Sequence, residues 1–181
     1  MRYVALLRGI NVGGKNKLDM KSLKEVFERV GMVSVKTYIN SGNIIFSSDE
    51  LSAKSLSATL EQAIYENFNL QIRVLVYNFE DYEKIALAVP ENWTNDNQMK
   101  SDVLFLWEEI NNESVLGQLV AKPEIDQINY VPGAILWAVD RQLVTKSGMM
   151  KVAGSELYKH MTVRNVNTVR KIYALMKDGK E

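Results

Sequence analysis

The stretch VKTYINSGNIIFS, residues 35–47, decides the fold prediction. Its two short runs, 35–39 and 43–47, are rich in β-branched and aromatic residues, which favour strands. Between them lies NSG, whose residues suit a tight reversal of the chain. We therefore predict a β-hairpin here, and the fold is built outward from it.

The strands and helices predicted on either side of the hairpin follow one another in the order of a known fold. Upstream, residues 3–7 are typical of a buried strand, and the apolar residues over 20–30 recur at helical spacing behind Asp19, a natural N-cap. Downstream, an amphipathic helix over 53–64 precedes an alternating strand over 72–77. The resulting order, β-α-β-β-α-β, is the split βαβ or ferredoxin-like arrangement.

The rest of the chain repeats this order less completely. A short helix over 79–86 ends before Pro90, and a polar segment without periodicity follows it. Beyond this segment, the Pro132-Gly133 dipeptide suits a type II turn. The patterns there predict strands over 103–107, 125–131 and 134–139, and helices over 112–120, 149–158 and 165–176.

The predicted fold class is α+β, with two ferredoxin-like (split βαβ) subdomains in tandem. The first subdomain covers 1–90 and carries the glycine-rich loop, a connector covers 91–100, and the second subdomain covers 101–181 and ends in a helix. We expect the second subdomain to lack or modify its last strand, because a helix stands where a fourth strand would be.

The composition limits the chemistry. The chain has 181 residues, 46% of them apolar, with 22 basic and 22 acidic side chains, so it can bury a full core and lacks the charge excess of a non-specific nucleic-acid binder. The absence of cysteine excludes disulfides and thiol catalysis, and His160 alone cannot form a histidine-rich metal site. No apolar run approaches the roughly 20 residues that cross a bilayer, and the run over 3–7 is too short for a signal-peptide core. We therefore expect a soluble, cytoplasmic protein with no membrane partner and no metal centre; its cofactors are unknown.

The segment GINVGGKNK, residues 9–17, follows the first predicted strand. Its spacing matches that of a phosphate loop, but Asn16 stands where a hydroxyl should bind magnesium. Lys15 also falls short of the helix that begins behind Asp19, so the helix dipole and the lysine would not converge on a phosphate. We therefore predict that this glycine loop does not hydrolyse nucleotides.

The same loop can still bind an anion. Gly9, Gly13 and Gly14 permit left-handed backbone conformations, in which N–H groups can form an anion-binding nest. The basic residues that supply charge are Arg8, Lys15 and Lys17. In the alternative interpretation the glycines make a plain surface connection and the lysines are solvated.

At LLRGINVGGKN, TYINSGNIIF and RNVNTV the sequence resembles a family catalogued as domain of unknown function 1697, which contains uncharacterised bacterial proteins, over essentially the whole chain. The matching residues are Arg8, Gly9, Asn11, Gly13, Gly14 and Lys15, then Tyr38, Ser41, Gly42 and Asn43, then Arg164, Asn165, Asn167, Thr168 and Lys171. Members usually carry a tryptophan where this chain has Val166, which weakens a stacking role there. The resemblance implies two α+β subdomains of ferredoxin-like character, and it carries over no reaction because the family's activity is not established.

Topology brings two of these motifs to one place. In a ferredoxin-like sheet the first and third strands are neighbours, so Arg8 and the NSGN turn, residues 40–43, can approach the same edge. In the second half, Asn165 or Asn167 can cap the last helix, whereas Arg164 is unfavourable there unless an anion or a buried acid is near. The predicted ligand-binding residues are Arg8, Gly9, Asn11, Gly13, Gly14, Lys15, Asn40, Ser41, Gly42, Asn43, Ser147, Arg164, Asn165, Asn167 and Thr168. In the alternative interpretation Asn40 and Ser41 only satisfy their own turn.

Three functions remain open at this point. The first is binding of a phosphorylated or otherwise anionic small ligand in a cleft lined by the glycine loop, the NSGN turn and the start of the last helix. The second is RNA binding on an RNA-recognition-like sheet, for which Tyr3 and Phe46 are the available aromatics. The third is a protein-interaction module. No nucleophile–base pair stands out, so catalytic residues, enzymatic activity and oligomeric state are left open.

Overall fold

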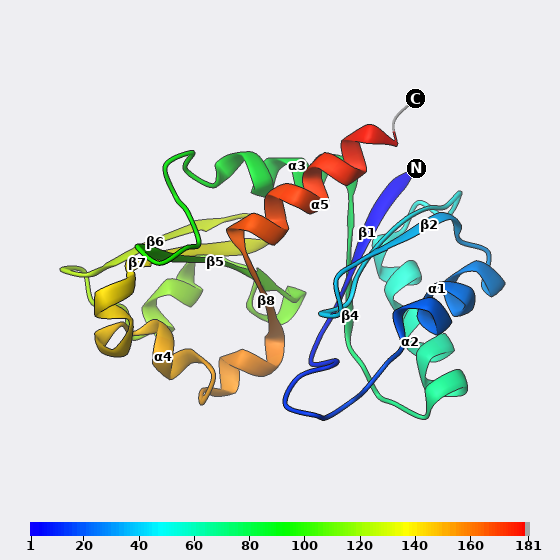
Figure 1. The fold of residues 1–181 in the computed structure, drawn as a ribbon, viewed down its shortest axis with the longest axis horizontal. Helices are drawn as coiled ribbons and strands as arrows, with labels where there is room; N and C mark the ends of the chain where they lie inside the picture. Colours follow the sequence, from blue (N-terminus) through cyan, green and yellow to red (C-terminus); the bar gives the residue numbers. More distant parts are fainter. Residues whose placement is uncertain (180–181) are drawn as a thin grey trace. The chain divides into compact units, whose positions relative to one another are not determined.

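The computed structural model describes residues 1–179 and contains two antiparallel sheets of four strands each. The chain forms two compact units, one made of Met1–Glu83 with the segment from Ile172 onward, the other of Lys84–Lys171. The unit boundaries fall within α3 (Phe79–Ala88) and α5 (Val166–Asp178). Figure 1 labels the α-helices and most of the strands of both sheets.

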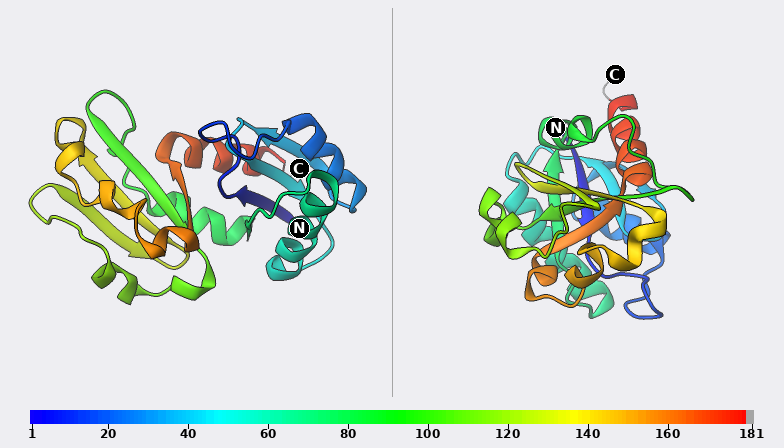
Figure 2. Two further views of the ribbon diagram at one scale, coloured as in Figure 1. Left: turned by 90° about the horizontal axis from the view of Figure 1, so that it is seen from below. Right: turned by 90° about the vertical axis from the view of Figure 1, so that its left-hand side faces the viewer.

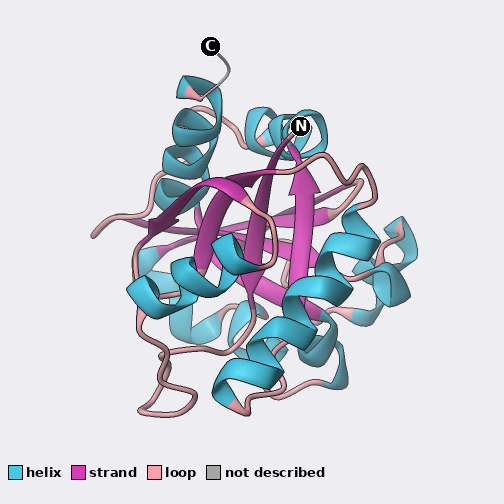
Figure 3. Cartoon of the chain, turned by 90° about the vertical axis from the view of Figure 1, so that its right-hand side faces the viewer, coloured by secondary structure: helices cyan, strands magenta, loops and turns pink. Residues whose placement is uncertain are grey.

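The first unit has the predicted ferredoxin-like topology. Its sheet has the order β2-β3-β1-β4, and every neighbouring pair is antiparallel. Two helices lie across one face of this sheet, as Figures 1 and 3 show. The strands and helices are β1 (Arg2–Leu7), α1 (Met20–Arg29), β2 (Val33–Tyr38), β3 (Asn43–Ser47), α2 (Ala53–Phe68) and β4 (Val74–Asn78). The predicted hairpin is therefore confirmed as β2 and β3.

The local sequence explains where these elements begin and end. The Asp19 side chain accepts a hydrogen bond from the Ser22 backbone N–H, so the predicted N-cap of α1 is confirmed. Ser52 caps the start of α2 in the same way. Asn69, the C-cap that follows the last helical residue, has a left-handed conformation. Residues 3–7 of β1 are all fully buried, as expected for a central strand with both faces covered.

The second unit has the same strand order, β6-β7-β5-β8, and Figure 2 shows its sheet with the short helices beside it. Its strands are β5 (Met99–Leu106), β6 (Asp126–Val131), β7 (Ala134–Asp140) and β8 (Met161–Asn165). The fourth strand, which we expected to be missing or modified, is present as β8 and pairs with β5. The pattern did not predict β8 because its polar residues Thr162 and Arg164 are buried, so no alternation of apolar and polar residues marks it.

The helices predicted over 112–120 and 149–158 are shorter in the structure, whereas the helix predicted over 165–176 is present as α5. The helical elements that lie wholly in the second unit are the 3₁₀ helices η1 (Glu108–Ile110), η2 (Glu113–Gln118), η3 (Arg141–Lys146) and η4 (Glu156–His160), and the α-helix α4 (Met149–Val152). The helix expected over 149–158 breaks after Val152, where the Ser155 hydroxyl donates to the Val152 carbonyl at 2.7 Å. Gly133 has a φ of 96°, as the predicted type II turn between β6 and β7 requires.

Candidate functional site

The glycine loop is a miniature hairpin. The backbone N–H of Lys15 donates to the Val12 carbonyl at 3.0 Å, and the N–H of Asn11 donates to the Asn16 carbonyl at 3.1 Å. Between these bonds Gly13 and Gly14 have φ values of 58° and 75°, the left-handed pair that a type I′ turn needs. The two glycines are therefore required by the turn itself.

This geometry differs from a phosphate loop. The helix α1 begins at Met20, and Asp19 already engages one backbone donor of its first turn, because its carboxylate accepts from the Ser22 N–H at 2.9 Å and from the Ser22 hydroxyl at 2.8 Å. The bonds from the Ser22 backbone and hydroxyl lower the pKa of Asp19, so the carboxylate stays charged near the helix start. An anion at this helix terminus would meet the negative charge of Asp19.

Asn11 ties the glycine loop to the NSGN turn. Its side-chain Nδ2 donates to the carbonyls of Asn40 at 2.8 Å and Leu18 at 3.0 Å, and its Oδ1 accepts from the Leu18 N–H at 2.8 Å. Asn11 has a φ of 53°, in the left-handed region that asparagine tolerates better than most residues. The approach of the loop to the turn, which we inferred from topology, is therefore confirmed within the first unit.

A backbone hydrogen bond also joins the end of β1 to the NSGN turn. The Leu7 N–H donates to the Gly42 carbonyl at 2.9 Å, and Gly42 has a φ of 85°. A Cβ at Gly42 would lie 2.8 Å from the Leu7 Cβ and 2.8 Å from the Ile10 Cδ1, closer than carbon atoms approach. Gly42 is therefore needed both for its conformation and for the close approach of the turn to β1.

Two polar residues of the turn have local structural roles. The buried Asn43 side chain donates to the Tyr38 carbonyl and to the Ser41 hydroxyl, both at 3.0 Å. These bonds support the alternative interpretation for Ser41, and they show that Asn43 also holds the turn closed. Ile39, beside the turn, has a φ of 50°, which is uncommon for a β-branched residue.

A shallow hollow lies where the loop meets the turn. It has a volume of about 390 Å³ and is lined by Asn11, Gly14, Lys17, Leu18, Asp19 and Asn40. Lys15 and Lys17 are exposed, and among residues 1–179 neither ammonium forms an ion pair. The hollow therefore has positive charge at its margin and amide and backbone groups in its wall.

The third motif lies in the second unit. The buried Arg164 belongs to β8 and donates to the Thr162 hydroxyl at 2.8 Å and the Val163 carbonyl at 2.9 Å. Asn165 accepts from the Thr168 N–H at 3.1 Å and so caps the start of α5, one of the two cap positions that we expected. Arg164 and Asn165 thus have internal partners, and Thr168 is buried beside them.

The rest of this motif anchors the segment before β5. The Asn167 amide donates to the Asn95 carbonyl at 3.0 Å. The Arg170 guanidinium donates to the carbonyls of Trp93 at 2.7 Å and Pro90 at 2.9 Å. The asparagine that was a candidate for ligand binding therefore holds a connecting segment in place.

Ser147 is 3% exposed and donates its hydroxyl to the buried Asp126 carboxylate. The same carboxylate accepts from the backbone N–H groups of Lys122 at 2.8 Å and Gly148 at 3.0 Å. Burial alone would raise the pKa of Asp126, but the hydrogen bond from Ser147 and those from the backbone outweigh it, so the pKa is lowered. Ser147 is therefore engaged in a structural network.

The RNA-recognition interpretation does not fit the first sheet. Tyr3 and Phe46 are both 0% exposed, and their rings stack on each other at 5.6 Å inside the core formed with α1 and α2. The Tyr3 hydroxyl donates to the Glu50 carbonyl at 2.8 Å. Since base stacking needs exposed aromatic faces, Tyr3 and Phe46 cannot form the RNA platform that was one of the open alternatives.

Metal and membrane sites are also unsupported in the described part of the chain. Within residues 1–179, no three histidine, cysteine or carboxylate side chains gather where they could hold a metal ion. No helix over the same residues is long and apolar enough to cross a membrane.

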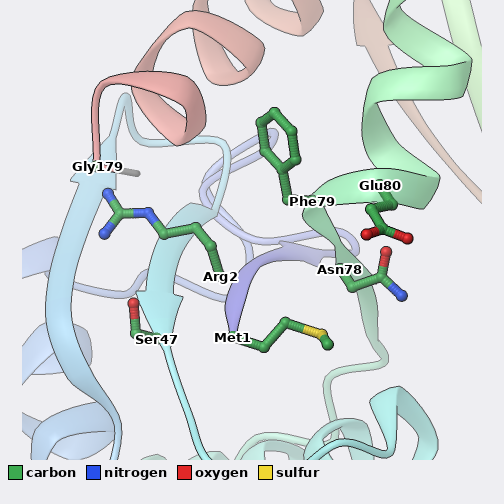
Figure 4. Close-up of a pocket in the computed structure, with 7 residues that line it drawn as sticks. All are labelled: Met1, Arg2, Ser47, Asn78, Phe79, Glu80 and Gly179. Atoms are coloured by element: carbon green, nitrogen blue, oxygen red, sulfur yellow. The ribbon is translucent and has the colours of Figure 1, made fainter. Parts of the chain in front are cut away.

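A second hollow, of about 370 Å³, lies at the start of β1. Figure 4 shows Arg2 on one side of it and Asn78 and Glu80 on the other. The full lining is Met1, Arg2, Ser47, Asn78, Phe79, Glu80 and Gly179. We did not predict this pocket, because its residues are far apart in the sequence and belong to no motif.

The comparisons with known proteins place the chain in a family, and the family match includes the glycine loop and the NSGN turn. Residues 1–137 match the family described as "Protein of unknown function (DUF1697)". The chain belongs to the DUF1697 family. This DUF1697 chain is also similar to the solved structure of the conserved bacterial protein SP0830 from Streptococcus pneumoniae, with 30% sequence identity and a TM-score of 0.83. That match covers 97% of this chain and 98% of the other, so the likeness includes both units, and no curated protein matches this chain.

Proposed function

We propose that the first unit of this DUF1697 protein binds a phosphorylated or otherwise anionic small ligand in the hollow between the glycine loop and the NSGN turn. The observation that supports this most directly is the set of three hydrogen bonds made by the Asn11 side chain, which hold the loop against the turn. Because the loop is fixed, Lys17 at the margin of the hollow and Lys15 beside it need less ordering when a ligand binds.

The charges of the hollow favour an anion over a cation. Lys17 in the lining and Lys15 beside it outnumber Asp19, the one acidic residue of the lining, whose charged carboxylate already accepts hydrogen bonds from Ser22 in the first turn of α1. The two lysines have no described carboxylate partner to displace. Lysine binds phosphate as a point charge, and the volume of about 390 Å³ lies within the usual range for small-molecule sites.

The proposal is limited to binding. The lining of the hollow offers two asparagines, one lysine and one aspartate, and none of these forms a nucleophile–base pair. The DUF1697 family description assigns no reaction.

The test is a thermal-melt panel with nucleotides, sugar phosphates, inorganic phosphate and short RNA, each with and without magnesium. The proteins are the wild type, Lys15→Ala, Lys17→Ala and a control, Lys54→Ala, which removes an exposed lysine of α2 in the same unit. A ligand at about 100 times its dissociation constant should stabilise the wild type by roughly 2.7 kcal/mol. The two loop variants should lose this stabilisation, whereas Lys54→Ala should keep it.

Two results would count against the site. One is a panel in which no anion shifts the wild type. The other is a ligand whose effect survives in both loop variants, which would place the binding site elsewhere. If short RNA raised the melting temperature of all four proteins equally, the protein would bind nucleic acid at a surface other than this hollow.

A further inference from the structure

The pocket at the start of β1 lies outside the proposed anion site and uses other residues. All seven lining residues belong to the first unit. Its volume of about 370 Å³ is at the lower end of the range for small-molecule sites, so it suits a compact ligand. The chemistry of its lining narrows the class of that ligand.

Arg2 supplies a cation with a hydrogen-bond donor that lacks a partner. Its Nε is buried and has no hydrogen-bond acceptor among residues 1–179. A buried, unpaired N–H of a charged group is unfavourable, and native structures usually explain such groups by a bound water, ion or ligand. The planar guanidinium favours carboxylate, which accepts from it in a two-point geometry.

The position of Arg2 is set by its neighbours. Arg2 is paired with Ser47 across β1 and β3. A Cβ placed on Gly179 would overlap the Arg2 guanidinium carbon and its nitrogens. Gly179 therefore leaves the space that the guanidinium occupies, and Figure 4 shows the side chain reaching toward it.

The opposite side of the pocket is acidic. Glu80 and Asp81 stand in the first turn of α3. Asp81 is engaged by Asn78, whose amide donates to the Asp81 carboxylate at 3.0 Å and accepts from its N–H at 2.8 Å. Glu80 is exposed, lines the pocket and forms no ion pair with Arg2, as far as residues 1–179 are concerned.

The wall between the two charges is apolar and fixed. Phe79 is buried, and its ring stacks on Tyr173 at 6.0 Å with an angle of 23° between the ring planes. The Tyr173 hydroxyl in turn donates to Glu83 at 2.7 Å. Met1 supplies a second apolar surface. The pocket thus has a cation on one side, an anion on the other and apolar surface between them.

We propose that this pocket binds a small zwitterion of the free amino acid class. The α-carboxylate of the ligand accepts hydrogen bonds from the terminal nitrogens of the Arg2 guanidinium, and its ammonium group lies at the Glu80 carboxylate. The apolar part of the ligand packs against Phe79 and Met1. A molecule that carries both charges satisfies the two unpaired groups together, which neither a simple anion nor a simple cation does.

The experiment is a thermal-melt screen of the wild type against the standard free amino acids, followed by calorimetric titration of the best binder. The deaminated acid and the decarboxylated amine of that amino acid are titrated in parallel. We expect the amino acid to bind, and each one-charge analogue to bind roughly tenfold more weakly or worse. A screen without any shift, or an analogue that binds as tightly as the amino acid, would overturn the proposal.

Variants then test the two charges. Arg2→Gln and Glu80→Gln should each weaken binding by roughly tenfold or more, and Glu80→Gln should bring the amino acid and its deaminated acid to similar affinities. Arg29→Gln, an exposed arginine of α1, is the control and should bind normally. If Arg2→Gln fails to fold, Gly179→Ala replaces it, because the added methyl group displaces only the flexible end of Arg2. Normal affinity in Glu80→Gln, or in whichever Arg2-directed variant folds, would refute the assignment.

Discussion

The side-chain amide of Asn11 donates a hydrogen bond of 2.8 Å to the backbone carbonyl of Asn40, 29 residues farther along the chain. The same side chain makes two more bonds to the backbone of Leu18. One asparagine therefore joins the loop after β1, the segment before α1 and the turn between β2 and β3. Its place in the family motif is explained by this junction, whether or not a ligand binds there.

Asn11→Gly should destabilise the protein by about 1–3 kcal/mol, because it leaves the backbone groups of Leu18 and Asn40 without their partner. Glycine adopts the same left-handed backbone conformation, so the loss of stability reports on the side-chain amide of Asn11 alone. Asn16→Gly is the matched control, since Asn16 also has a positive φ and its side chain makes one exposed bond to the Gly9 carbonyl. Urea unfolding and hydrogen exchange of the Leu18 amide measure the effect; equal losses in both variants would contradict a special role for Asn11.

Ile39→Asn should stabilise the protein. Ile39 has a φ of 50° and is 49% exposed, so the substitution relieves backbone strain and removes little buried surface. The gain should be about 1 kcal/mol, which corresponds to a rise in melting temperature of roughly 2–4 °C. Val33→Asn is the control, because Val33 is 57% exposed in β2 without a positive φ and should not gain. A lower melting temperature for Ile39→Asn would show that the Ile39 side chain packs more than its exposure indicates.

Gly148→Ala should be strongly destabilising, by more than about 2 kcal/mol. A Cβ at Gly148 would overlap the carbonyl oxygen of Val120, and this oxygen belongs to the backbone, which cannot swing away. Gly117→Ala provides the comparison, since a Cβ there meets no atom within 4 Å. Chemical denaturation of the two variants checks the prediction, and similar midpoints would mean that the segment around Val120 moves easily.

The protein should lose stability in acid partly through Asp126. The folded-state pKa of Asp126 lies below its ordinary value, so its contribution is complete above the unfolded pKa of about 3.9 and is lost as the pH falls toward the folded pKa. Asp126→Asn should therefore cost stability at pH 7, by about 1–3 kcal/mol, and the difference from wild type should narrow below about pH 4. Urea unfolding across this pH range measures it. A constant difference would show that Asp126 is not the titrating group.

The first unit was predictable because its signals are local. The NSG turn between two β-rich runs and the Asp19 cap ahead of an amphipathic helix each define an element within a few residues. The junction between the glycine loop and the turn followed from strand order alone. The role of Asn11 in holding this junction did not follow from strand order. A side chain that bonds to a residue 29 positions away leaves no periodic pattern in the sequence.

The second unit was harder to predict for the same physical reason. In β8 the buried Arg164 and Thr162 interrupt the apolar pattern of a strand. Ser147 reads as a polar residue before a helix, but its partner Asp126 lies 21 residues earlier. The pocket between Arg2 and Glu80 depends entirely on tertiary structure, because β1 and α3 meet only in the folded unit.

The anchoring of the segment before β5 bears on the order in which the chain folds. Pro90, Trp93 and Asn95 present carbonyl groups whose donors lie 80, 77 and 72 residues later, in Arg170 and Asn167. During synthesis these carbonyls lack their α5 donors until that helix leaves the ribosome, whereas the first sheet can already pair its four strands. A nascent chain stopped before residue 165 should thus carry a protease-sensitive segment that the finished protein protects.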